Sequence, residues 1–320
     1  MNRPLAASLL FLAAFSPASA NDSIATLGAG GLILIRADTI SMEKEDLFIS
    51  PGEVRVNYVF RNNDAADRTY LMAFPMPQID PQQYLESDIS VPERNKENFM
   101  NFAVTVDGAK VEPKLEMRAL SGGLDVTDMV SALGVPLNPL ADETRTALAA
   151  IPREKLGPLI AMGAVAVSDE GVSPAWSLKS TYYWQQNFPA KAPLAVAHTY
   201  TPAVGATFYY EDAGGDGNIA KDFCIDAGTA KAINSKIATG SKDSHYLMQR
   251  TIEYILTTGA NWQGAIGDFR LVVDKGAPDA IVSFCMDGVK KISPTQFEVR
   301  KKDFYPTDEL KILLLNSPSQ

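Results

Sequence analysis

The stretch PGEVRVNYVFRNNDAADRTYLMAFPMP, residues 51–77, decides the fold class of this chain. Apolar side chains occupy every second position from Val54 to Phe60, with polar residues between them. This period of two is typical of a β-strand that buries one face. The run ends in Phe-Arg-Asn, and a second apolar run then ends in Phe-Pro-Met-Pro. The stretch therefore predicts two consecutive strands.

Further strands follow the same pattern, and most are separated by Gly, Pro, Asn or Asp. Residues 102–108 lead into Asp107-Gly108, a pair that tolerates the positive φ of a tight hairpin turn, and a second strand follows it. The remaining predicted strands cover residues 177–188, 194–200, 245–256, 268–274, 280–286, 295–301 and 309–315. Strands at this spacing predict a mainly β chain built as one or more antiparallel β-sandwiches.

Helix is predicted in two places. Residues 125–163 carry a broken apolar stripe that Pro152 and Pro158 interrupt, which indicates two or three short helices inserted between β regions. A further helix is expected near 226–238, with Asp226 as its N-cap. We therefore expect an N-terminal β-sandwich region at 21–118, a helical insertion at 119–172 and a C-terminal β-rich region at 173–320.

The first 20 residues, MNRPLAASLLFLAAFSPASA, have the pattern of a cleaved signal peptide. Arg3 precedes a short apolar run, and Ala18-Ser19-Ala20 gives a small-residue cleavage site. No later segment is apolar enough over a sufficient length to span a membrane. We expect a soluble protein, periplasmic or secreted, from a bacterium. Its net charge of −9 without a basic cluster argues against nucleic acid and anionic membranes as partners.

The two cysteines of the chain are Cys224 and Cys285. An oxidising compartment favours a disulfide between them, and the alternative is a pair of buried free thiols. There is no Cys-x-x-Cys motif, which argues against a redox-active dithiol.

Two families share motifs with this chain. Residues 51–77 followed by NFAVTVDGAKVEPKLE, 101–116, resemble the strand order of VIT (vault/inter-alpha-trypsin) domains, β-sandwiches of extracellular and scaffold proteins. The chain from residue 21 onward resembles the bacterial domain-of-unknown-function family 4424. Its motifs here are NDSIATLGAGGL, DLFISPGEVRVNYVFRN, FPMP, YYWQQNFPA, HTYTPAVG, TGANWQGAIGDFRLVVDKG and SFC. This resemblance implies export and one architecture, and it implies no activity.

The stretch TTGANWQGAIGDFRLVVDKG, residues 257–276, places a tryptophan among glycines in a connection between two strands. One interpretation is that Trp262 folds back over the end of the sandwich and is buried. The other is that Trp262 is an exposed anchor for a partner, with Asn261, Asp268 and Arg270 as its polar surround.

Other candidate sites are weaker. Glu211, Asp212, Asp216 and Asn218 offer oxygen ligands for Ca²⁺, although the spacing is not that of an EF-hand and a solvated turn explains it equally. His198 is expected to be a buried, hydrogen-bonded residue of a strand. The GAGG segment at 28–31 is interpreted as a flexible N-terminus, because a dinucleotide loop requires a strand before it and a helix after it.

The sequence contains no catalytic motif that we can assign, and it indicates no cofactor besides the Ca²⁺ hypothesis. The first function hypothesis is an exported, non-catalytic β-sandwich protein that binds an envelope or extracellular protein or a surface polymer. The alternative is a secreted hydrolase, acting for example on carbohydrate, that uses an unidentified carboxylate pair.

Overall fold

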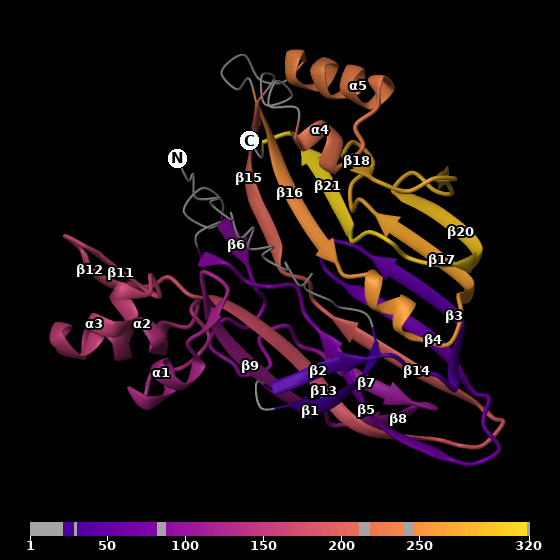
Figure 1. Cartoon of the computed structure of the whole chain (residues 1–320). Helices are drawn as coiled ribbons and strands as arrows, with labels where there is room; N and C mark the ends of the chain where they lie inside the picture. The colour runs from indigo at the N-terminus through magenta and orange to yellow at the C-terminus, as the bar shows by residue number, and fades with distance from the viewer. Residues whose placement is uncertain (1–21, 29–30, 82–87, 211–217, 240–245, 319–320) are drawn as a thin grey trace, which may run out of the picture.

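The computed structural model describes residues 22–28, 31–81, 88–210, 218–239 and 246–318. The predicted signal peptide at 1–20 lies outside these residues. Within them the chain is mainly β, with short helices, so the predicted fold class is confirmed (Figure 1). No helix in the described ranges is long and apolar enough to cross a membrane.

An eight-stranded sheet joins strands from both halves of the chain. Its order is β19 (Lys290–Lys291), β20 (Gln296–Phe304), β17 (Ile266–Asp274), β3 (Ile40–Ile49), β4 (Val54–Asn62), β14 (Pro193–Tyr200), β7 (Ala103–Val106) and β8 (Ala109–Val111). β4 is the strand predicted from residues 53–60. Its buried residues alternate with exposed or partly exposed ones, as the sequence pattern requires.

Two further sheets pack with this one. The six-stranded sheet has the order β10 (Leu124–Asp125), β9 (Lys114–Ser121), β13 (Ser177–Phe188), β5 (Arg68–Pro75), β1 (Ser23–Gly28) and β2 (Gly31–Ile35). The five-stranded sheet has the order β18 (Ile281–Phe284), β21 (Leu310–Asn316), β16 (Tyr246–Tyr254), β15 (Val204–Tyr210) and β6 (Asp88–Ser90). All three sheets contribute side chains to one large hydrophobic core.

Among the described strands, one pair is parallel. β17 lies parallel to β3, with Leu271 opposite Leu47. These strands come from opposite ends of the chain, so no tight turn joins them and none fixes their relative direction. β3 also carries a bulge between Met42 and Lys44, close to where the pairing with β17 begins.

The predicted regions 21–118 and 173–320 do not occupy separate sheets. β3 and β4 of the first region lie beside β17 and β14 of the third. The division at residues 118 and 172 stays a prediction, since nothing in the structure tests whether either part folds alone.

The helices of the insertion and the helix near 226–238 form where the sequence predicted them, whereas the short helix at 218–222 was not predicted. The insertion contains α1 (Thr127–Ala132), α2 (Asp142–Ala149), α3 (Arg153–Ala161) and the two-stranded sheet of β11 (Val165–Ser168) and β12 (Gly171–Pro174). It projects from the sheets in Figure 1 and has a core of its own around Trp176. The second helical part contains α4 (Asn218–Asp222) and α5 (Ala227–Ala238), and the Asp226 carboxylate accepts a hydrogen bond from the backbone N–H of Thr229. α5 packs through Ile233 and Ile237 onto the five-stranded sheet.

Two local predictions have different outcomes. Asp107 and Gly108 both have positive φ, 47° and 80°, and they form the predicted hairpin turn between β7 and β8. Gly28 and Gly31 are the paired ends of β1 and β2, so these two residues are not part of a flexible N-terminus, whereas Ala29 and Gly30 lie outside the described residues. β1 also pairs with β5, which ties the N-terminal residues into the six-stranded sheet.

Candidate functional site

The tryptophan of the 257–276 stretch is buried. A 3-10 helix, η3 (Thr257–Asn261), leads into Trp262, whose side chain is 1% exposed. Its ring lies 4.4 Å from the ring centroid of Phe60, and its Nε1 donates a hydrogen bond of 2.8 Å to the carbonyl of Asp22. Asn261 donates from Nδ2 to Ser23 Oγ. Trp262 is therefore buried, as in the interpretation that it folds back onto the sandwich, and its side chain is not an exposed anchor.

The other two residues proposed for this site lie elsewhere. Arg270 lies on the face of β17 opposite buried Leu271, in ion pairs with Glu298 and Asp46. Asp268, on the same face as Arg270, pairs with Lys302. The structure thus places Asn261 and Trp262 against the N-terminal strand and the two charged residues on the outside of the eight-stranded sheet. It does not gather the four residues into one site.

His198 is a core residue, as expected. Its side chain is completely buried, and its Nε2 lies 2.9 Å from the Oδ2 atom of Asp22. Burial raises the pKa of the Asp22 carboxyl, while the neighbouring imidazole opposes that shift. The rings around His198 belong to Tyr58, Phe74, Phe102 and Trp184. This pair is closed off from solvent, so it ties the N-terminal strand to the core and offers no entrance to a ligand.

The Ca²⁺ hypothesis is not tested. Glu211, Asp212 and Asp216 lie outside the described residues, and Asn218 begins α4. Within the part of the chain that is described, no group of three or more His, Cys, Asp or Glu side chains is placed to hold a metal ion.

The predicted disulfide is present. Cys224 and Cys285 are joined, with their Cα atoms 5.0 Å apart. The bond links the turn between α4 and α5 to the residue that follows β18. Ser283 donates a hydrogen bond of 2.8 Å to the carbonyl of Phe223 beside it. The helical pair and the five-stranded sheet are therefore held together both covalently and by a buried hydrogen bond.

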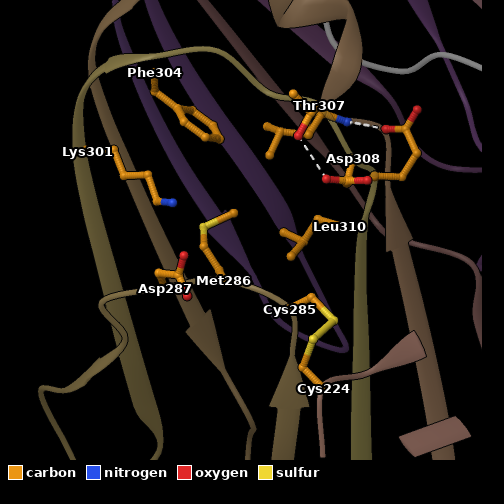
Figure 2. A pocket seen from close by; sticks show the side chains of 11 residues that line it. Cys224, Cys285, Met286, Asp287, Lys301, Phe304, Thr307, Asp308 and Leu310 are labelled. Carbon is orange, nitrogen blue, oxygen red and sulfur yellow. Dashed lines mark hydrogen bonds between the residues drawn. A yellow bond between two sulfur atoms is a disulfide. The ribbon is translucent and has the colours of Figure 1, made fainter. Parts of the chain in front are cut away.

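The disulfide also forms one wall of a pocket of about 310 Å³, which we call the disulfide pocket. It lies where the end of β18, the inner face of β20 and the segment before β21 meet, and Figure 2 shows its side chains. The apolar part of its lining consists of Leu256, Met286, Phe304 and Leu310. A volume of this size is at the small end of the range for ligand pockets in proteins.

Charged side chains face this pocket from two sides. Lys301 extends from β20, and Figure 2 shows Asp287 on the same side of the pocket as Lys301, with Asp308 on the opposite side. The Lys301 Nζ atom lies 5.2 Å from the centroid of the Phe304 ring. No carboxylate among the described residues lies within ion-pair distance of that atom. Asp308 accepts a hydrogen bond from the Thr307 hydroxyl, and among those same residues neither aspartate forms an ion pair.

Glu309 has a structural role in the wall. Its Oε2 accepts the backbone N–H of Leu256 at 2.7 Å, and its Oε1 accepts the hydroxyl of Thr257 at 2.6 Å. These bonds fix the segment before β21 against the start of η3. Asp308, one residue earlier, is thereby held at the pocket on a braced segment.

Sequence reasoning found the cysteines of this site and missed Lys301, Asp287 and Asp308. The adjacency of Cys285, Met286 and Asp287 was the available signal, since a residue next to a disulfide shares its surroundings. Nothing in the sequence indicated Lys301, because β20 lies near the disulfide only through the packing of the sheets.

Comparisons with known proteins give one family match and a similar solved structure. No curated protein matches the chain. A crystal structure of a Legionella pneumophila protein described as a "putative nutrient binding protein" is similar with a TM-score of 0.45 and 16% identity, over 93% of this chain and 70% of that chain. A similarity of this size says nothing about what the present chain binds. Residues 20–313 match the family described as "Domain of unknown function (DUF4424)", and the chain therefore belongs to that family.

Proposed function

We propose that this chain is an exported, non-catalytic binding protein that engages another envelope protein or a surface polymer through the disulfide pocket. The observation that carries the proposal is a pocket held by the disulfide, in which Lys301, Asp287 and Asp308 form no ion pair among the described residues. Charged groups that face a pocket without internal ionic partners are available to a ligand. The proposal does not depend on Trp262.

Export is the second part of the proposal. The signal-like residues 1–20 support it, and so does a disulfide between the two cysteines of the chain. Disulfides persist in oxidising compartments such as the bacterial periplasm and are rare in the cytosol. The resemblance of residues 51–116 to VIT domains stays a prediction and fits the same view of an extracytoplasmic binding scaffold.

A crosslinking experiment tests the binding role. The oxidised protein, carrying an affinity tag, is crosslinked in an envelope fraction of its own organism, beside Lys301→Met and Lys302→Met. The second variant is the matched control, because Lys302 neighbours Lys301 but pairs with Asp268 on the other face of β20. We expect an adduct with wild type and Lys302→Met that Lys301→Met loses at an unchanged melting temperature. An adduct that all three proteins form equally would contradict the pocket as the binding site.

The hydrolase alternative has one observation in its favour, namely that Asp287 and Asp308 line the same pocket. Glycoside hydrolysis requires two carboxyl groups on either side of the scissile bond. Hydrolysis of a glycan panel by wild type that both Asp287→Asn and Asp308→Asn abolish would establish it. Binding of a partner without turnover would leave the first proposal in place.

A further inference from the structure

The charges of the disulfide pocket also indicate the class of its ligand. Lys301 pairs in register with Phe269 of β17, a fully buried residue, so its side chain lies on the core-facing side of the sheet. Its ammonium group lies over the Phe304 ring. A half-buried ammonium group gains from an anionic ligand, because a hydrogen bond between charged groups replaces part of its hydration. This wall of the pocket is therefore suited to a carboxylate.

The opposite side has the opposite charge. Asp308 uses one carboxylate oxygen for the Thr307 hydroxyl, which leaves acceptor capacity on the other. Asp287 also lines the pocket, but Figure 2 shows it on the side of Lys301, so Asp308 is the carboxylate that faces Lys301 across the pocket. Glu309 is already engaged with the backbone at Leu256, so it contributes bracing more than recognition. This side is therefore suited to an ammonium group.

The lining between the two charged sides is apolar. Leu256 and Leu310 are almost fully buried beneath it, and Met286 and Phe304 are partly exposed. A purely cationic ligand would meet Lys301, and a purely anionic ligand would meet Asp287 and Asp308. A ligand with both charges, separated by an apolar side chain, satisfies every part of the lining.

We propose that the ligand of the disulfide pocket is a free short peptide, whose carboxylate and ammonium termini lie on either side of an apolar side chain. Lys301 binds its carboxylate, Asp308 binds its ammonium group, and Phe304 and Met286 contact the apolar side chain. This inference rests on the proposed function and makes the ligand a free peptide fragment of the envelope protein or surface polymer, because the end of a longer chain carries only one of the two charged groups.

Calorimetric titration with the dipeptide Ala-Leu, its N-acetyl form and its C-terminal amide tests this assignment. We expect the free dipeptide to bind the oxidised wild type. Lys301→Met and Asp308→Asn should each weaken that binding by roughly tenfold to a hundredfold, the usual effect of losing a hydrogen bond between charged groups. The controls Lys302→Met and Asp303→Asn, whose positions do not line the pocket, should bind as wild type does.

The modified peptides assign each charge to its residue. The C-terminal amide should bind weakly and be indifferent to Lys301→Met, and the N-acetyl form should be indifferent to Asp308→Asn. Equal affinity for all three peptides, or no peptide binding while the envelope adduct still depends on Lys301, would overturn the ligand class and leave the proposed function standing. If Lys301→Met still forms the adduct and still binds the dipeptide as the wild type does, both proposals are wrong.

Discussion

Replacing Cys224 and Cys285 together by Ala should lower the free energy of unfolding by about 4 kcal/mol. The two residues are 61 positions apart in the sequence, and the figure follows from the loop-closure entropy that a bridge of this span removes from the unfolded chain. With an unfolding entropy of about 2.1 cal/mol/K per residue, the melting temperature should fall by roughly 6 °C.

Differential scanning calorimetry of the oxidised wild type, the reduced wild type and the double variant measures this shift. Ser283→Ala is the comparison, because it removes only the neighbouring hydrogen bond to Phe223 and should cost about 1–2 kcal/mol. An unchanged melting temperature in the double variant, with the wild-type bridge verified by intact mass, would refute the entropic reasoning. A loss confined to hydrogen-exchange protection in α5 would show that the bridge stabilises only the helical pair.

Three further changes test the packing of the 257–276 stretch and the N-terminal strand. Gly267→Ala should destabilise the protein by about 1–3 kcal/mol in urea titration, because the new Cβ would lie 2.8 Å from the backbone oxygen of Glu43. The control Gly52→Ala should be nearly neutral, because a Cβ there meets nothing within 4 Å. Trp262→Ala should cost about 3–5 kcal/mol by thermal or urea unfolding, since the side chain is buried, while a change within about 0.5 kcal/mol would restore the exposed-anchor interpretation. Burial raises the pKa of Asp22 above its usual 3.8, so the folded state binds the proton more tightly than the unfolded state. The contribution of Asp22 to the free energy of unfolding therefore falls as the pH rises from 3.8 through the pKa of the folded state. In urea titrations between pH 3.5 and 7, Asp22→Asn should lack this fall in the free energy of unfolding. A constant difference in that free energy between the two proteins across the pH series would contradict the raised pKa of Asp22.

Local patterns in the sequence predicted local structure well. The alternation from Val54 to Phe60 became β4, Asp107-Gly108 became a hairpin turn, and Asp226 became a helix cap. Each of these features depends on residues close in sequence, where side-chain period and backbone φ preference act directly.

Long-range features were beyond the reach of the same patterns. The parallel pairing of β3 with β17 and the contact of Trp262 with Asp22 join opposite ends of the chain. Nothing in the periodicity of either segment specifies its partner, because a strand exposes similar backbone groups to any neighbour. Gly267 illustrates the limit, since the structure requires a glycine there for close approach to the backbone of Glu43, a contact that the sequence around Gly267 does not specify. The disulfide pocket was missed for the same reason.

The buried pair of His198 and Asp22 allows the attachment of the N-terminal strand to be measured. His198→Leu leaves a buried carboxylate without its imidazole partner, which should cost about 3–5 kcal/mol. Asp22→Asn combined with His198→Leu replaces both charged or chargeable groups, so the double variant should be more stable than the sum of the single losses predicts. Urea titration of the wild type, both single variants and the double variant gives this coupling free energy. Additive losses would mean that the two side chains do not stabilise one another. A positive coupling would show that the first described residue of the chain, although far from β14 in sequence, contributes to the stability of the main core through this one contact.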